Sequence, residues 1–177
     1  MGTNPDRAPV DAADLDAIVC RGDHNMLVVT ATADGEHAGC LVGFHTQSSI
    51  DPWRYTVCLS KLNHTYAVAR KADHLLLHFL DESQHRLAHL FGGFTDDAML
   101  DREKVDLVEW RPGPDGVTPL LAGVDDWVLG RIEAQHHRDG DHGLFVVSAV
   151  AAGHHAPDGS RPFRYSHAAD IAPGHPA

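Results

Sequence analysis

The chain has 177 residues, of which 43% are hydrophobic and 22% charged, and its formal net charge is −11 at pH 7. This length suits one domain with a sizeable core, and two domains would be cramped. The acidic balance and the scattered Arg and Lys argue against affinity for nucleic acid, whose phosphates need a basic patch. No apolar run approaches the roughly 20 residues that span a bilayer, so we expect no membrane partner.

The cysteines and histidines predict neither disulfides nor a metal site. Cys20, Cys40 and Cys58 show no short pairing, which favours reduced thiols and therefore a cytoplasmic location. Fifteen histidines are present, but neither an HExxH pattern nor a cysteine pair accompanies them. The polar, acidic N-terminus does not resemble a signal peptide.

The first elements follow from caps and turn signals. Asp11 is a suitable N-cap for a short helix over 12–20. The β-rich run 26–33 ends at Asp34-Gly35, a strong hairpin signal. We therefore expect a second strand, antiparallel to the first, over 38–46.

A proline corner and a polar corner follow. Asp51-Pro52 ends the second strand, because proline lacks a backbone donor and has a fixed φ. The alternating segment 53–60 predicts a strand, and Asn63 is a suitable cap for a helix over 64–71. The apolar run 74–80 predicts a buried strand.

The second half contains a helix, a loop-rich stretch and two long strands. We expect a helix over 82–90 that is stopped by the glycines of 91–93. Residues 94–120 are mixed and rich in turn signals. Residues 127–137 and 143–151 predict two long strands joined by a turn.

Strands at this spacing predict a mainly β fold, a β-barrel with a few peripheral helices. We expect a disordered lead-in over 1–11, one barrel domain over 12–152 and a C-terminal extension over 153–177. The extension is rich in Pro, Gly, His and Ala.

The segment 39–66 is the strongest candidate for a binding site. It places hydroxyls, amides and one lysine around Asp51-Pro52, and a helix begins near its end. Hydroxyls, a cation and helix-start amides bind phosphate well. A hairpin with ordinary polar connections explains the same residues, and their spacing alone leaves both interpretations open.

The order of segments adds a resemblance. The chain contains VVTATADGEHAGCLVGFHTQSSIDPWRYTVCLSKLNHTY, then HLLLHFLDESQHRLAHLFGG, then GDHGLFVVSAV. Over residues 26–151 this order resembles the flavin reductase-like family, which has an FMN-binding split β-barrel of Greek-key type. Leu41 and Gly43 stand where the family often has hydroxyl or amide side chains, so we expect backbone groups to hold most of the flavin ring.

The resemblance implies a set of site residues. The backbone around Phe44, His45 and Thr46 is expected against the isoalloxazine, and His142 of the GDH segment is expected near the flavin and the nicotinamide. The residues expected at the ribityl chain and the phosphate are Gln47, Ser48, Ser49, Ser60, Lys61, Asn63, His64 and Thr65. Asp139-Gly140-Asp141 is also a good turn, so His142 has a plain structural alternative as a hairpin corner.

The function implied by the resemblance is hydride transfer from NADH or NADPH to FMN or FAD by a homodimeric reductase. The resemblance implies that the reduced flavin is either released to a partner monooxygenase or kept as a prosthetic group. Two alternatives stay open, namely a non-enzymatic FMN-binding electron-transfer protein and a split-barrel module that binds another cofactor.

Overall fold

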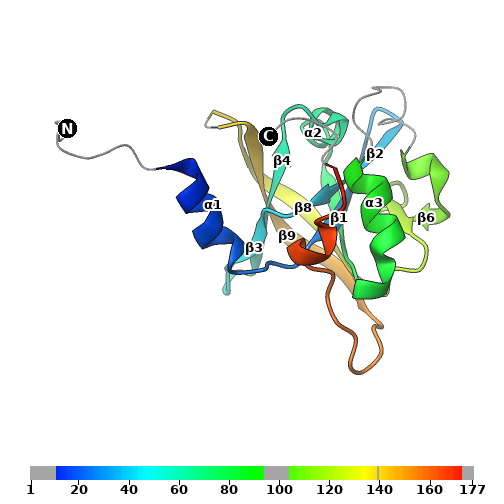
Figure 1. Ribbon diagram of the computed structural model, residues 1–177. Coiled ribbons are helices and arrows are strands. Elements are labelled where there is room, and N and C mark those ends of the chain that lie inside the picture. The colour runs from blue at the N-terminus through cyan, green and yellow to red at the C-terminus, as the bar shows by residue number, and fades with distance from the viewer. Residues whose placement is uncertain (1–10, 94–103, 139, 173–177) are drawn as a thin grey trace.

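The structure is a computed structural model that describes residues 11–93, 104–138 and 140–172 (Figure 1). Except for Asp11, the predicted lead-in over 1–11 lies outside the described residues. None of the helices in these ranges is long and apolar enough to cross a bilayer.

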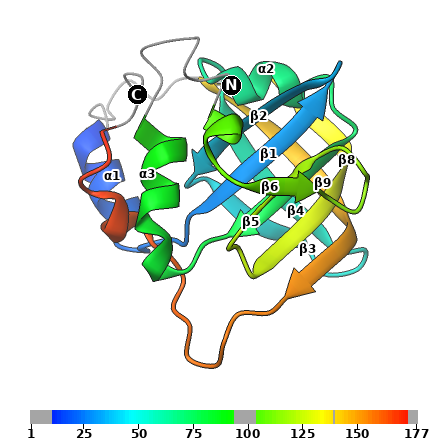
Figure 2. The same ribbon diagram turned by 90° about the vertical axis from the view of Figure 1, so that its right-hand side faces the viewer.

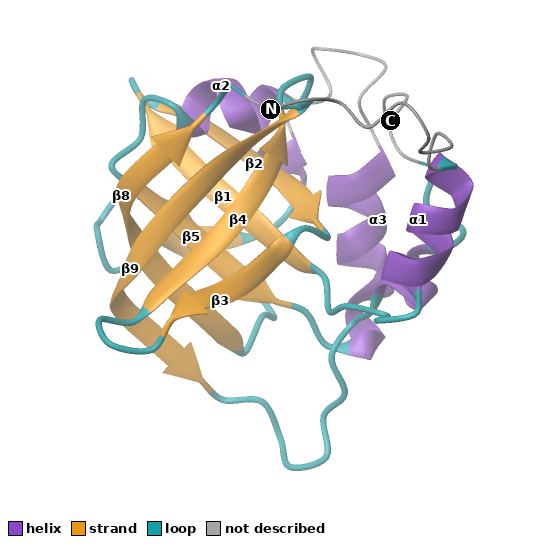
Figure 3. Cartoon of the chain, turned by 90° about the vertical axis from the view of Figure 1, so that its left-hand side faces the viewer, coloured by secondary structure: helices purple, strands orange, loops and turns teal. Residues whose placement is uncertain are grey.

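One sheet of seven strands forms the body of the molecule (Figures 2 and 3). Its strands are β1 (Leu27–Ala33), β2 (Glu36–Val42), β3 (His45–Ser49), β4 (Arg54–Ser60), β5 (His74–Phe79), β8 (Asp126–His136) and β9 (His142–His154). They lie in the order β2-β1-β5-β8-β9-β4-β3, and every neighbouring pair is antiparallel. The sheet curls on itself, so the prediction of a mainly β barrel with few helices is confirmed.

In the described part of the chain three α-helices accompany the sheet, namely α1 (Ala12–Cys20), α2 (His64–Ala69) and α3 (His85–Gly93). Both predicted caps are confirmed. The Asp11 side chain accepts a hydrogen bond from the N–H of Ala13 at 3.0 Å, and Asn63 accepts one from the N–H of Thr65 at 3.1 Å. In Figure 1, α2 lies over one end of the barrel, α3 beside it, and α1 apart from the sheet.

Alternating side chains of the strands fill the barrel interior. Leu27, Val29 and Ala31 of β1 point into one cluster with residues of β2, β4, β5 and β9, and nearly all are fully buried. The opposite face of β1 contributes Val28 to a second cluster beneath α3. Because strand side chains alternate between faces, β1 therefore contributes to both cores.

The prediction of one continuous strand over 38–46 is wrong. The chain leaves β2 at Val42, passes through Gly43 and Phe44, and begins β3 at His45. β2 pairs with β1, whereas β3 pairs with β4 at the other edge of the sheet. The two-residue link joins the two ends of the strand order, which lie close together because the sheet curls into a barrel.

The third helix runs through 91–93, three residues beyond its predicted end at residue 90. A 3₁₀ turn over Glu82–Gln84 leads into α3, which includes Phe91, Gly92 and Gly93. A Cβ on Gly92 would lie 3.0 Å from side-chain atoms of both Leu41 and Ile171. The glycine at 92 therefore permits close packing of the helix on its neighbours.

The C-terminal segment packs on the barrel. β9 runs to His154, two residues beyond the predicted domain boundary at 152. Farther on, Phe163 is fully buried, accepts from the N–H of Met26 at 2.8 Å and donates to the carbonyl of Leu80 at 2.8 Å. Residues of the predicted extension thus contribute to the second core cluster.

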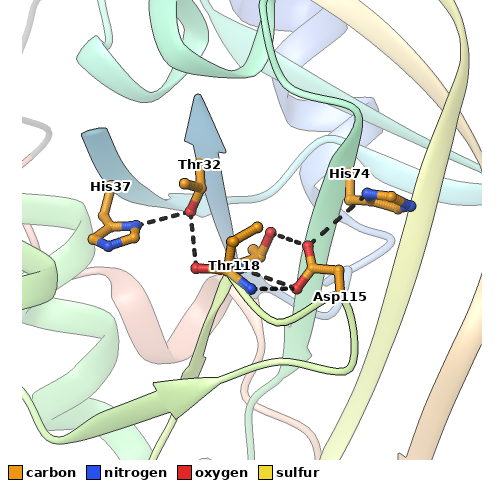
Figure 4. A network of polar contacts seen from close by, with 6 residues as sticks. Thr32, His37, His74, Asp115 and Thr118 are labelled. Carbon is orange, nitrogen blue, oxygen red and sulfur yellow. Dashed lines mark hydrogen bonds and ion pairs between the residues drawn. The ribbon is translucent and has the colours of Figure 1, made fainter. Parts of the chain in front are cut away.

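A small hairpin of β6 (Trp110–Pro112) and β7 (Pro119–Leu121) covers part of β1 and β5 (Figure 4). Asp115 holds its turn by accepting from the N–H and the hydroxyl of Thr118, at 3.0 and 2.5 Å. His74 of β5 lies 3.9 Å from the Asp115 carboxylate, and Thr32 of β1 donates to the carbonyl of Val117 at 3.3 Å. These contacts fix a loop-rich segment against the barrel.

Candidate functional site

A cavity of ≈ 500 Å³ lies between the barrel and the C-terminal segment. Its lining residues come from β2, β4, α3, the short 3₁₀ helix η2 (Lys104–Leu107), the N-cap of α2 and the start of β9. Residues 165–171, including the 3₁₀ helix η3 (Tyr165–Ala168), complete the enclosure. Its volume is within the range of cavities that bind small organic ligands.

Four of the predicted site residues line this cavity, namely Phe44, Ser60, Asn63 and His142. Phe44 and His142 lie edge to face, with ring centroids 5.2 Å apart. Ser60 pairs with His142 in the ladder between β4 and β9, so the sheet register places these two side chains together. Most of the remaining lining is apolar, which suits a flat aromatic ligand with a polar end.

The hydrogen bond of His142 defines its tautomer when the ring is neutral. Its Nδ1 lies 2.7 Å from Oδ1 of Asp141, a carboxylate that only accepts, so Nδ1 carries the proton. This contact lowers the pKa of Asp141 below its usual value. In the neutral ring Nε2 is therefore an acceptor, and in the protonated ring it is a second donor.

Lys61, His64 and Thr65 are close to Ser60 and Asn63 in the chain but do not line the cavity. The Lys61 ammonium donates to the carbonyl of Gly140 at 2.5 Å, and His64 Nε2 lies 2.9 Å from Glu36 Oε1. Thr65 is buried, and its hydroxyl has no hydrogen-bond partner among the described residues. Because Thr65 does not line the cavity, this hydroxyl belongs to the packing behind the corner.

The structure does not bring the five residues of β3 to the cavity. The chain turns at Gly43-Phe44 and β3 then pairs with β4. None of its residues, His45, Thr46, Gln47, Ser48 and Ser49, lines the cavity. His45 is held by Tyr55 and by the carbonyl of Asn25, both at 2.7 Å, and burial lowers its pKa. A binding role for these five residues stays a prediction.

Sequence reasoning missed two contributors to the cavity. Lys104 lines it and is only 1% exposed, although it lies in the loop-rich stretch where no pattern singled it out. Tyr165 lines it from η3, and the N–H of Tyr165 donates to the carbonyl of His24 at 2.9 Å. Asp23 also holds this segment, because its carboxylate accepts from the N–H and the hydroxyl of Ser166 at 2.9 and 3.0 Å.

A larger hollow of ≈ 760 Å³ lies at the other end of β9, near His154. Two of its carboxylates already serve the local turns: Asp126 accepts from the N–H groups of His155 and Ala156, and Asp81 accepts from that of Arg161. Within the described ranges, no group of three or more His, Cys, Asp or Glu side chains is arranged to hold a metal ion. The smaller cavity, which gathers the predicted residues, is therefore the candidate site.

Comparison with known proteins agrees with this fold. Residues 22–170 match the family model described as the flavin reductase like domain. The chain is 30% identical over 144 residues to the reductase component of the Rhodococcus opacus 4-nitrophenol 4-monooxygenase/4-nitrocatechol 2-monooxygenase, covering 81% of this chain and 73% of that protein. It is also 30% identical over 149 residues to the FMN reductase (NADH) RutF of Methylorubrum extorquens, covering 81% and 68%.

The fold is shared with solved structures as well. A flavin reductase domain protein from Arthrobacter sp. FB24 superposes with a TM-score of 0.74 at 19% identity, covering 88% of this chain and 91% of that one. A chain from Sinorhizobium meliloti 1021 superposes with a TM-score of 0.69 at 26% identity, and there the protein spans 50% of the other chain's length. The barrel is thus the split barrel of flavin reductases, and the protein belongs to the flavin reductase like family.

Proposed function

We propose that the protein is an NAD(P)H-dependent flavin reductase that binds FMN or FAD in the ≈ 500 Å³ cavity. The observation that carries the proposal is the convergence of Phe44, Ser60, Asn63 and His142 on one largely apolar cavity in a chain of this family. The FMN reductase (NADH) named among its relatives supports FMN as cofactor and NADH as donor. A Streptomyces globisporus NADH:FAD oxidoreductase with the same fold supports FAD as the alternative cofactor.

The residues present fit a flavin. Ser60 and Asn63 offer a hydroxyl and an amide to the phosphate end. When bound, the flavin accepts a hydride from the nicotinamide, and that chemistry belongs to the cofactor. Phe44, which is 59% exposed, offers an aromatic ring at the cavity, while His142, oriented by Asp141, presents Nε2 as a polar contact.

The partners of the protein belong to the same proposal. Two-component monooxygenases contain a reductase of the kind found in Rhodococcus opacus, which supports a monooxygenase as acceptor of reduced flavin. A homodimer is supported by α1, which buries none of its side chains although Leu15, Ile18 and Val19 are apolar. A cytoplasmic location is supported by three cysteines that are all free thiols.

The deciding experiment is an assay of NADH and NADPH oxidation with FMN and with FAD, combined with a flavin titration of the purified protein. We expect rapid oxidation of at least one donor that depends on added or bound flavin. A protein that binds flavin tightly but shows no turnover with either donor would be an electron carrier. A protein that binds no flavin would be a module for another ligand.

A further inference from the structure

The C-terminal part of the chain passes over the cavity as a short strap, which we define as residues 164–170. It contains η3 and lies beside α3, where Figure 1 shows it as an orange-red coil. Phe163 before the strap and Ile171 after it are buried and anchor its two ends. Four strap residues line the cavity, namely Tyr165, Ser166, Ala168 and Ala169. Displacement of the strap between its anchors therefore opens the cavity on this side.

Asp23, in the link between α1 and β1, holds the first half of the strap. Its carboxylate accepts from the N–H and the hydroxyl of Ser166 at 2.9 and 3.0 Å, and its carbonyl accepts from the Arg164 guanidinium at 3.1 Å. The carbonyl of His24 accepts from the N–H of Tyr165 at 2.9 Å. The hydrogen bond from the Ser166 N–H lowers the pKa of Asp23, so the carboxylate is charged at neutral pH.

The second half of the strap is held by an exposed polar contact. Nε2 of His85 in α3 lies 2.9 Å from Oδ1 of Asp170, and both side chains are exposed. Polar contacts at the surface contribute little stability, and segments held by them open locally at a low cost in free energy. The strap can therefore open while Phe163 and Ile171 stay buried.

We propose that Asp23 is a positioning residue for flavin, which holds the strap over the cavity through Ser166 and thereby sets the rate at which flavin leaves. The inference rests on the proposed function, because it requires a flavin in this cavity. It deepens that function, since a reductase that supplies flavin to a second enzyme releases it in every cycle. Asp23 itself does not line the cavity, so it acts through the strap.

The test is the dissociation rate of oxidised FMN from wild type, Asp23→Gly and Asp23→Asn, followed by flavin fluorescence after rapid dilution. Asp23 has a φ of 40°, which glycine adopts freely, so Asp23→Gly removes the carboxylate without straining the backbone. We expect Asp23→Gly to raise the rate about tenfold, the effect of one lost hydrogen bond to a charged group. Asp23→Asn should give an intermediate rate, because its amide keeps one acceptor for the Ser166 N–H.

Asp34→Gly is the matched control. Asp34 also has a positive φ, of 54°, and its carboxylate also has a partner, the Lys71 ammonium at 3.2 Å. The substitution changes the net charge and the backbone freedom in the same way, but Asp34 lies in the hairpin turn after β1 and does not line the cavity. Its dissociation rate should equal that of wild type.

A double-substitution cycle with Ser166→Ala separates an effect on the strap from a direct contact with flavin. In wild type, Ser166→Ala removes one of the two hydrogen bonds to the Asp23 carboxylate and should raise the rate less than Asp23→Gly does. In the Asp23→Gly background it should add nothing, because that bond is already absent. An equal increase in both backgrounds would mean that Ser166 binds flavin itself, and the role of Asp23 would be refuted.

Two further results would overturn the proposal. An unchanged rate in Asp23→Gly would make the contact between Asp23 and the strap structural only. A rate raised equally in Asp34→Gly would make the effect a general one of charge and backbone freedom.

The inference can fail separately from the proposed function. If wild type binds FMN and oxidises NADH but the substitutions leave the dissociation rate unchanged, only the role of Asp23 falls. If wild type binds neither FMN nor FAD, the proposed function falls first and the role of Asp23 with it. Should Asp23→Gly not fold, Asp23→Asn and Ser166→Ala give the same comparison with smaller changes.

Discussion

Ser60 and Ser48 are chemically identical residues of the same polar segment, and the structure separates them. Ser60 ends β4 at the cavity, whereas Ser48 lies on β3 and accepts a hydrogen bond from Thr56 at 2.9 Å. We expect Ser60→Ala to weaken FMN binding about 10- to 100-fold, since a lost hydrogen bond to a charged group costs about 1.5–3 kcal/mol. Riboflavin, which has no phosphate, should be affected less.

Ser48→Ala is the matched control, and its affinity for FMN should equal that of wild type. Fluorescence titration of the two variants with FMN and with riboflavin provides the comparison. Weaker binding in Ser48→Ala with no change in Ser60→Ala would place the phosphate on β3 and contradict the cavity assignment.

His78 is a fully buried histidine whose two ring nitrogens are both used. Nδ1 donates to the carbonyl of Val28 and Nε2 accepts from the N–H of Leu121, each at 3.1 Å. The ring is therefore neutral, and burial lowers its pKa from 6.5 to about 4. It joins β5 to β1 and to β7, which lies at the edge of the second core.

The lowered pKa of His78 predicts loss of stability in acid. Between pH 6.5 and about 4 the unfolded chain binds a proton that the folded protein does not, so the free energy of unfolding falls as pH falls, by about 3 kcal/mol in total. Urea unfolding at pH 7 and pH 4.5 measures this loss. In His78→Gln, which cannot titrate, the loss should be smaller, and equal losses in both proteins would contradict the prediction.

At the scale of elements, α1 is a helix without a covered face. Val19 of α1 is 55% exposed, and Val117 in the turn before β7 is 53% exposed. If α1 packs on a second copy, Val19→Asp should shift the protein from dimer to monomer, because a buried carboxylate is unfavourable. Val117→Asp changes the same side chain at the same exposure and should leave the dimer intact.

Sedimentation equilibrium of wild type and the two variants measures the oligomeric state. A monomeric wild type would contradict the dimer. A dimer that persists in Val19→Asp would move the interface away from α1.

The sequence predicted helix starts and turns correctly where they depend only on residues that are neighbours in the chain. Asp11 and Asn63 mark helix starts because a cap acts within three residues, and Asp34-Gly35 marks a turn, with both residues at positive φ. The break at Gly43-Phe44 was not predicted because it depends on which edge of the sheet the next strand joins. Gly92 was misinterpreted for a similar reason, since its neighbours Leu41 and Ile171 are remote in sequence.

At the scale of the whole molecule, the candidate site is assembled from segments that the chain brings together only on folding. The sequence indicated Ser60 and Asn63 through a polar corner, and His142 through its resemblance to a family pattern. Lys104 and Tyr165 have no such pattern around them, and they reach the cavity because η2 packs on β2 and because Asp23 holds η3. Prediction of such residues requires the tertiary structure.

The C-terminal segment contains two aromatic residues with different expected roles. Phe163 is fully buried in the second core cluster, whereas Tyr165 is 52% exposed and lines the cavity. Phe163→Ala should lower the free energy of unfolding by about 3–5 kcal/mol, the usual cost of deleting a buried phenyl ring. Tyr165→Ala removes a ring of similar size from the same segment and should cost less than about 1 kcal/mol.

The affinity for flavin should fall more in Tyr165→Ala than in Phe163→Ala, because Tyr165 contributes to the cavity and Phe163 to the core. Urea unfolding and FMN titration of both variants at pH 7 measure the two effects, with folding of Phe163→Ala checked first by circular dichroism. A small stability loss in Phe163→Ala would mean that the barrel folds without residues 153–177. In that case the C-terminal segment would be a separable cover of the cavity, and its truncation would abolish flavin binding without unfolding the barrel.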